Sequence, residues 1–594
     1  MDIDTTFHVT WTTLSFVAVA LALSVLRLYQ LAIPKPIPGI PYNKTSKKLL
    51  GDVPAIVEHM AKTEGGTFVT YILKSMESLD SPLIQIFIRP FGKPHLVLGD
   101  YPEAYDILMR RREFDRSPTL GDLVKGLTPD LHIHLKTNDT WKAQRRLIQD
   151  LMTPSFLHNV AGPVLYQNLG LLIDLWRMKS HIANGRPWKA ADDINQMALN
   201  GLTGFSFGED FKHSAIKPAL LAVQGMDEEA LAIIRRKGPD EFVEFPKGQE
   251  STALRAIREL TETVGEVQGN PVPALTWAYV TRKPRIRKAI RIKEDCIEKE
   301  LMNGVQRWEE TSGRVIKSAV DQMIVREKRL AEKEGRTPNF FSRVMIDECG
   351  LKIFGFILAG HETTSTALNW TLKYLADYPS IQSELREALR RAFPTLGYSG
   401  RSPSINEITS TSIPYLDAVI EEILRCAGAI PVVDRVATAD TELLGHHIPK
   451  GTVVTCLVTG PSLLSAAFDV EISRRSPTSQ SDVKEGRHRS WDPAGISRFN
   501  PDRWIIRGNG NGDEIEFNPT AGPQLAFGLG TRGCYGKRLV YLEMRIFLTL
   551  ILWNFELLPC PPAVSTYHAK LIASNEPTHT YVRLREISRE KTIN

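Results

Sequence analysis

The sequence predicts a mainly α-helical protein with a small β region, organised as a single large domain behind an N-terminal transmembrane helix. Most of the 594-residue chain carries apolar residues at helical spacing, in segments of roughly 12 to 25 residues. Alternating segments at 81–97 and 447–458 predict a few short strands. Residues 5–26 contain no Asp, Glu, Lys or Arg, which indicates a membrane-spanning segment.

The composition excludes several classes of function. An apolar fraction of 42% and a charged fraction of 24% are ordinary for a globular protein. The net charge of +5, from 73 basic and 68 acidic residues, is too small to indicate nucleic-acid binding, so no nucleic-acid partner is expected. The six cysteines lie far apart without a CxxC motif, so neither a disulfide framework nor a zinc module is predicted.

The first 33 residues are predicted to form a single-pass membrane anchor. The 18 residues Val9–Leu26 are just long enough to cross the hydrocarbon core as a helix. Trp11 and Tyr29 lie near the two ends, where aromatic rings suit the membrane interface. Acidic residues precede the segment and basic residues follow it, so the positive-inside rule places the rest of the chain in the cytosol.

Two alternatives to the anchor stay open. Ala18-Val19-Ala20 has the small-x-small pattern of a signal-peptidase site, although it lies inside the apolar run and no basic n-region precedes it. A buried core helix is the other alternative. The next segment, 34–42, holds four prolines and is predicted to be a stiff, extended hinge. Residues 43–594 then form the main domain.

Within the main domain, the longest apolar helix is predicted at 350–378 and a second strong helix at 413–427. The polar, Ser- and Arg-rich segment 471–490 is predicted to be an exposed loop. The many charges of residues 281–337 are interpreted as solvated helix faces and a loop rather than as a binding site.

The strongest chemical signal is the string FGLGTRGCYG at 527–536. Its four glycines allow a tight turn with positive φ, in which several backbone N–H groups can point at one atom. A cysteine at that position, Cys534, would be stabilised as a thiolate. The apolar helix predicted at 539–553 adds the positive end of its dipole. Such a thiolate is a suitable axial ligand for haem iron.

This string resembles the haem-binding loop of the cytochrome P450 family, FxxGxRxCxG, at every fixed position from Phe527 to Gly536. The resemblance implies the cytochrome P450 fold for residues 43–594 and haem b as cofactor. It makes Cys534 the axial ligand of the iron and Phe527 part of the cofactor-binding loop. The chain also resembles microsomal members of the family, and in particular fungal members that act in secondary metabolism.

Two further motifs point to a structural network. Glu422-Ile423-Leu424-Arg425 fits the family's ExxR motif, and residues three apart share one helix face, so Glu422 and Arg425 can pair. Glu421 would shift the register by one and does not give ExxR with Arg425. The string FNPDRW at 499–504 is similar to the family's PERF-type segment, whose arginine, here Arg503, completes a triad. By resemblance these three residues are structural.

Two motifs concern the propionates and the oxygen chemistry. Trp141 and Arg145 fit WxxxR, and residues four apart share a face, so both can donate to one carboxylate. By resemblance that carboxylate is a haem propionate, with Arg435 and Arg532 as the other partners. The string AGHETT at 359–364 interrupts the apolar helix and resembles the family's oxygen-activation motif. By that resemblance Thr363 holds protons and water and Glu362 relays protons from solvent, whereas His361 is structural or solvent-facing.

The resemblance implies a monooxygenase that uses O2 to hydroxylate or epoxidise a lipophilic small molecule. Its electrons would come from NADPH-cytochrome P450 reductase, at the endoplasmic reticulum membrane. A haem-thiolate isomerase or dehydratase and a non-catalytic haem-binding protein remain as alternatives. The reductase is hypothesised to dock near four basic residues, and apolar stretches at 120–134, 354–359 and 430–433 are candidates for the substrate pocket. The four basic residues are Lys142, Arg146, Lys537 and Arg538.

Overall fold

The computed structural model describes residues 4–44, 48–89, 92–270, 272–338, 340, 343–396, 401–508 and 515–587. The outermost residues of the predicted anchor and main domain, 1–3 and 588–594, lie outside these ranges. Helices dominate the structure, as the sequence predicts. The helices are α1 (Asp4–Ala32), α2 (Val53–Lys62), α3 (Phe68–Leu79), α4 (Tyr101–Met109), α5 (Pro118–Val124), α6 (Asp139–Ile148), α7 (Pro154–Phe156), α8 (Gly162–Ala183), α9 (Ala191–Phe207), α10 (Lys217–Gln224), α11 (Glu228–Arg236), α12 (Thr252–Val267), α13 (Pro273–Val280), α14 (Pro284–Thr311), α15 (Ala319–Glu334), α16 (Arg343–Asp377), α17 (Pro379–Ala392), α19 (Ile405–Ser410), α20 (Pro414–Ala427), α21 (Pro477–Lys484) and α22 (Lys537–Asn554).

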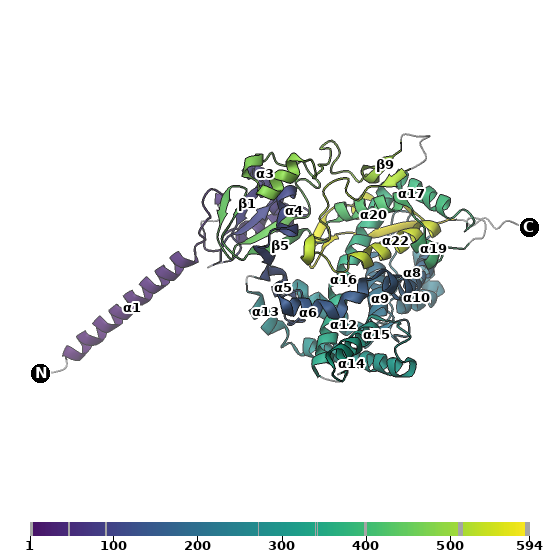
Figure 1. Ribbon diagram of the computed structural model, residues 1–594, viewed down its shortest axis with the longest axis horizontal. Helices are drawn as coiled ribbons and strands as arrows, with labels where there is room; N and C mark the ends of the chain where they lie inside the picture. The colour runs from purple at the N-terminus through teal and green to yellow at the C-terminus, as the bar shows by residue number, and fades with distance from the viewer. Residues whose placement is uncertain are drawn as a thin grey trace, which may run out of the picture.

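The β structure is small and is built around one sheet of five strands in the order β1-β2-β8-β5-β3. This sheet lies with α3 and α4 on the side of the body nearest α1 (Figure 1). Strands β1, β2, β7 and β8 lie within one residue of the two segments that the alternating pattern predicts. The many helices and the small β region together confirm the predicted fold class. The strands are β1 (Leu83–Ile86), β2 (His95–Leu98), β3 (Phe114–Arg116), β4 (Trp188–Lys189), β5 (Val432–Ala437), β6 (Thr441–Leu443), β7 (His446–Ile448), β8 (Val453–Leu457), β9 (Ile505–Arg507), β10 (Ile515–Phe517), β11 (Phe555–Leu558), β12 (Ala569–Leu571), β13 (Asn575–Pro577) and β14 (Tyr581–Glu586).

The centre of the body is α16, which runs for 35 residues through the helical part (Figure 1). Its apolar face is fully buried at Ile353, Phe354 and Ile357. Gly360 lets α9 approach closely, because an added Cβ would lie 2.9 Å from a methyl group of Leu202. The helix is therefore fixed on several sides, which gives the residues on its remaining face defined positions.

The N-terminal helix projects away from the body (Figure 1). The span Trp11–Ala32 has 22 residues and a mean hydropathy of 1.8, so it is long and apolar enough to cross a membrane. Residues 11–31 are exposed, and Ala32 at its end is buried. The segment that follows, residues 34–42, is not a free linker. The side chain of Gln85 in β1 donates to the carbonyl oxygens of Ile37 and Ile40, at 3.0 and 2.7 Å, and accepts from the N–H of Ile37. The hinge is thus bound to the sheet.

The prediction of an exposed loop at 471–490 is right about exposure for most of the segment but wrong about the loop. This segment, called the insert below, contains a 3-10 turn at Ile472–Arg474 and the helix α21. The side chains of Arg475, Ser479 and Asp482 are buried. The polar composition misled the prediction because Arg475 and Asp482 form ion pairs with the residues at the two ends of α4, so the segment is ordered on the body.

One buried acid is a source of pH-dependent instability. Glu543 in α22 is 4% exposed, and its Oε1 has no hydrogen-bond partner among the described residues. Burial raises the pKa of this carboxyl from 4.5 to about 8. The folded state therefore favours the protonated carboxyl of Glu543. The contribution of this group to the free energy of unfolding is fully present below pH 4.5 and is lost as the pH rises toward 8.

We expect Glu543→Met to be more stable than the unmodified protein at pH 7 by up to about 3 kcal/mol, because each pH unit above 4.5 costs about 1.4 kcal/mol. The thermal midpoint of each protein should be measured from pH 5 to 8. The midpoint of the unmodified protein should fall more steeply with pH than that of the variant. Parallel pH profiles would contradict the assignment of the titration to Glu543.

Candidate active site

The cysteine loop is a tight turn that precedes α22. Gly528 and Gly530 have φ of +58° and +68°, a region that glycine enters without strain. The N–H of Cys534 donates to the carbonyl of Phe527 at 2.7 Å, and the N–H of Gly533 donates to that of Gly530 at 3.0 Å. The two hydrogen bonds fold residues 527–534 back on themselves. Cys534 is consequently held at the tip of the turn, three residues before the start of α22.

The surroundings of Cys534 both desolvate and stabilise its sulfur. The side chain of Cys534 is accessible to solvent, but protein atoms surround much of its thiol. The resulting desolvation is the largest influence on the thiol and raises its pKa. The backbone N–H groups of Gly536 and Lys537 donate to the sulfur, and the charges of Arg145 and Lys537 lie near it; all of these pull the pKa down. This is the arrangement of donors at a helix N-terminus that favours a thiolate and its binding to a metal ion.

The oxygen-activation motif lies in the middle of α16, where Ala359 is exposed within an otherwise largely buried helix. The hydroxyl of Thr363 donates to the carbonyl of Ala359 at 2.8 Å. Phe356, one helical turn before Ala359, packs against Tyr535 with ring centroids 5.9 Å apart. Tyr535 directly follows Cys534, so α16 and the cysteine loop lie side by side.

Glu362 holds its proton near neutral pH. Burial raises the pKa of this carboxyl from 4.5 to about 7, helped by the negative charges of Glu576 and Glu262, while Lys570 opposes the change. Lys570 and Glu576 form a cross-strand ion pair of 3.2 Å in the hairpin β12–β13. That hairpin is bound to α16, because Thr366 lies 2.7 Å from the hydroxyl of Ser574.

His361 is buried between α16 and α9. Burial lowers the pKa of its imidazole to about 4, and a backbone hydrogen bond to Asn195 opposes this change. The ring is therefore neutral at physiological pH. Of the two possibilities left open by the sequence, the structure favours a structural histidine.

Four arginines and a histidine form a cluster near the cysteine loop, called the cationic cluster below, in which Arg435 is buried and the other four side chains are half-buried. Arg116 in β3 stands directly opposite Arg435 in β5, a pairing of like charges that is unfavourable by itself. Burial, followed by the neighbouring arginines, lowers the pKa of Arg116 to about 9. Arg532 is affected similarly, with a pKa lowered to about 10 by burial first. The cluster consists of Arg116, His132, Arg145, Arg435 and Arg532.

The cationic cluster fits the carboxylates of haem. Nε of Arg116, Nη2 of Arg435 and Nη1 of Arg532 are buried donors without a hydrogen-bond partner among the described residues. These donors are buried and carried by positive charges that repel one another, so an anion that accepts their hydrogen bonds would stabilise the cluster. A carboxylate is suitable because its two oxygens match two N–H groups of a guanidinium. The ring of Trp141 completes the arrangement, since the guanidinium carbon of Arg532 lies 4.7 Å from its centroid. The residues present therefore fit haem, with its propionates at the cluster and its iron at Cys534.

Sequence reasoning missed two members of the cationic cluster, Arg116 and His132. Arg116 is the last residue of a short strand and has no recognisable motif, and its pairing opposite Arg435 brings it to the site. Burial, and then the charges of Arg145 and its neighbours, lower the pKa of His132 to about 3, so its ring is neutral and can accept or donate one hydrogen bond. A buried Nδ1 without a partner among the described residues supports a role in binding.

The ExxR and PERF-type motifs meet in one network behind the cysteine loop. Arg425 donates to Glu422 from Nε at 2.8 Å and from Nη2 at 2.6 Å, and both side chains are fully buried. Arg503 Nε donates to the same carboxylate at 3.1 Å. Trp504 was not singled out from the sequence, yet its indole N–H donates to Glu422 Oε2 at 2.9 Å. Glu422 therefore joins Arg425, Arg503 and Trp504, and it also accepts the backbone N–H of Asn500 at 2.8 Å and the thiol of Cys426 at 3.8 Å.

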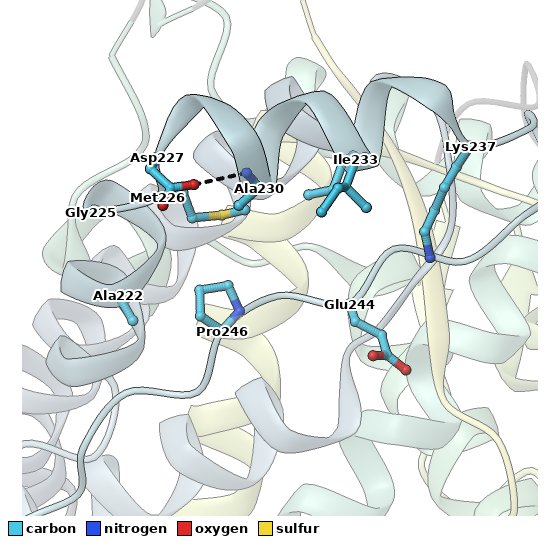
Figure 2. Close-up of a pocket in the computed structure, with 10 residues that line it drawn as sticks. Ala222, Gly225, Met226, Asp227, Ala230, Ile233, Lys237, Glu244 and Pro246 are labelled. Carbon is cyan, nitrogen blue, oxygen red and sulfur yellow. Dashed lines mark hydrogen bonds between the residues drawn. The ribbon is translucent and has the colours of Figure 1, made fainter.

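A surface pocket of about 420 Å³ lies between α10, α11 and the segment after α11 (Figure 2). Two of its charged residues have partners: Asp227 accepts from the N–H of Ala230 at 2.8 Å, and Lys237 donates to the carbonyl of Phe242 at 2.9 Å. None of its lining residues belongs to the motifs above. The pocket is therefore separate from the candidate active site.

The fold and the cysteine loop together define a haem-thiolate protein, and comparison with known proteins agrees. The model of the cytochrome P450 family matches residues 72–463 and 497–581. This chain belongs to the cytochrome P450 family and is an oxidoreductase, a monooxygenase that uses haem b. The unmatched residues 464–496 include the insert.

Similar proteins come from several fungi. A cytochrome P450 monooxygenase of Fusarium sporotrichioides, TRI13, is 38% identical over 583 residues, which cover 96% of this chain and 98% of the relative. The monooxygenase GME11363 of Pestalotiopsis microspora is 36% identical over 590 residues, or 97% and 99% of the two chains. The monooxygenase xilC of Penicillium rubens is 35% identical over 568 residues, or 95% and 94%. The resemblance to fungal family members is thereby confirmed.

Proposed function

We propose that this chain hydroxylates or epoxidises a lipophilic small molecule in secondary metabolism, with Cys534 as the ligand of the haem iron. The observation that carries the proposal is the position of Cys534, whose sulfur accepts two backbone N–H groups beside the face of α16 that presents Thr363. Bound haem supplies oxygen activation at a thiolate-ligated iron. The relatives named as monooxygenases along almost their full length support the same reaction class.

The residues of this chain have separate tasks in the proposed reaction. Trp141, Arg145, Arg435 and Arg532, joined by Arg116, bind the propionates and so orient the cofactor. Thr363 positions water and a proton, because its hydroxyl is held by the carbonyl of Ala359. Glu362, with a pKa raised to about 7 mainly by burial, exchanges protons near neutral pH and passes them toward Thr363.

We expect proton delivery to depend on Glu362 with an inflection near pH 7. The raised pKa means that the carboxyl is protonated below pH 7 and ionised above it, so product formed per NADPH oxidised should fall as the pH rises through 7. Glu362→Gln should lower turnover by about 10²-fold and remove the inflection. Glu576→Gln should move the inflection to lower pH, because it removes a neighbouring negative charge. An unchanged profile in both variants would contradict this role.

We infer that the protein is anchored in the endoplasmic reticulum membrane by α1 and receives electrons from NADPH-cytochrome P450 reductase. The length, hydropathy and exposure of α1 support the anchor, and the basic residues after it support a cytosolic body. The basic side chains proposed to bind the reductase are all exposed. They are Lys142, Arg146, Lys537 and Arg538.

A reduced, carbon monoxide-bound spectrum of the purified protein tests the proposal first. Thiolate ligation produces a strongly red-shifted band, and its absence would reject Cys534 as the ligand. A screen of terpenoid, polyketide and alkaloid ligands for a haem spin-state shift then identifies the substrate class. Turnover of the selected ligand should require O2, NADPH and the reductase. Conversion of a peroxide substrate without reductase would point instead to an isomerase or dehydratase.

A further inference from the structure

The insert (residues 471–490) is bound along one face of α4. Asp100, Glu103 and Asp106 are spaced three residues apart, so they share that face, and all three are buried. Arg475 donates to Asp100 from both terminal nitrogens, at 2.5 and 2.8 Å. The N–H of Ser476 donates to Glu103 at 3.3 Å. The insert therefore gives Asp100 an ion pair and Glu103 a hydrogen bond, whereas the charge of Glu103 is paired with Arg111 at 3.3 Å.

The insert also holds the C-terminal end of α4. The hydroxyls of Ser476 and Thr478 donate to Asp106 at 2.7 and 2.6 Å. Arg110, the residue after α4, forms an ion pair of 2.6 Å with Asp482 of α21. Asp482 is 2% exposed and the Arg110 side chain is 35% exposed, so one partner of this ion pair is buried and the other is half-buried. Asp482 also lies 3.2 Å from Arg487 and from His488 of the insert.

The same end of α4 touches the cysteine loop with no side chain between. A Cβ added at Gly530 would lie 2.4 Å from the carbonyl oxygen of Leu108, so the two backbones are in direct contact. The carbonyl of Gly530 in turn accepts the N–H of Gly533, the residue before Cys534. A displacement of α4 is thus transmitted through one backbone contact and one hydrogen bond to the cysteine.

A second contact joins α4 to the entry of the loop. The backbone N–H of Gln524, three residues before Phe527, donates to the hydroxyl of Tyr101 in α4. The ring of Tyr101 packs edge-on against His488 of the insert, with centroids 5.6 Å apart. The helix α4 therefore contacts both ends of the segment 524–530, and the insert contacts α4.

We propose that the insert is a positioning device for the cysteine ligand, with Asp482 and Arg110 as positioning residues. By holding α4 against Gly530, it keeps the sulfur of Cys534 within reach of the N–H groups of Gly536 and Lys537. The proposal rests on the proposed role of Cys534 as ligand. Because 464–496 lies outside the ranges that match the family model, the device is a feature of this chain and not of the matched family pattern.

The test uses the full-length holoenzyme and Asp482→Asn, which removes the charge bound by Arg110 and keeps the side-chain size. We expect the thiolate type of reduced carbon monoxide band to convert to the thiol type about tenfold faster than in the unmodified protein, with a measurable shift of the haem reduction potential. Asp482→Glu should restore both values. The matched control is Glu485→Gln, an exposed carboxylate of the same insert, which should change neither.

A purely stabilising insert gives a different result. Asp482→Asn would then lower the thermal midpoint, while the band, its conversion rate and the potential stay as in the unmodified protein, and the proposal would be overturned. If Asp482→Asn does not fold, Thr478→Val, which removes one hydroxyl bond to Asp106, should give a smaller change of the same sign. Lack of the thiolate band in the unmodified protein would reject the role of Cys534 itself, a separate outcome.

Discussion

Replacing Cys534 with serine is expected to abolish the red-shifted reduced carbon monoxide band and to reduce monooxygenase turnover below detection. A serine hydroxyl is neutral at physiological pH, so it cannot supply the electron density that a thiolate gives to the iron. The backbone donors of Gly536 and Lys537, which lower the pKa of the cysteine, would face a neutral oxygen instead. The loop geometry itself should survive, because its hydrogen bonds are between backbone groups.

The measurement is the spectrum of the reduced, carbon monoxide-bound protein at equal haem content. Cys296→Ser is the matched control: Cys296 is a half-buried thiol on α14, and burial raises its pKa to about 11, so it stays protonated. This control should keep the full band. An unchanged band in Cys534→Ser would contradict the proposal that Cys534 is the iron ligand and, with it, the assignment of the active site.

The parts of the site that could be predicted from sequence are those whose residues are close in the chain. The loop at 527–536 and the pair Glu422 and Arg425 depend on spacings of one to a few residues, and local geometry follows from such spacings. Arg116 and His132 escaped prediction because β-strand pairing and packing, not spacing, bring them to the cationic cluster. A lone arginine or histidine carries no signal of its eventual neighbours.

The insert was predicted to be an exposed loop, and the loop part of this prediction failed for a related reason. A polar segment favours solvent when it is considered alone, but Arg475 and Asp482 of the insert meet Asp100 and Arg110 of a helix more than 370 positions away in the chain. The complementary face was visible in the sequence as acids at 100, 103 and 106. Nothing in one sequence indicated that the two faces bind each other.

The second large effect is expected at the buried carboxylate of Glu422. Replacement by alanine leaves the guanidinium groups of Arg425 and Arg503 without their shared anion and removes the acceptor of the Trp504 indole. Removing one partner of a buried ion pair typically costs about 3–5 kcal/mol, because the remaining charge stays desolvated. Unfolding followed by circular dichroism and by loss of haem absorbance should show both transitions at lower temperature.

Arg401→Gln, which removes an exposed ion pair with Glu407, should change little. A Glu422→Ala protein with an unaltered thermal midpoint would show that the network contributes nothing to the stability of the fold, and the triad would lose its structural role.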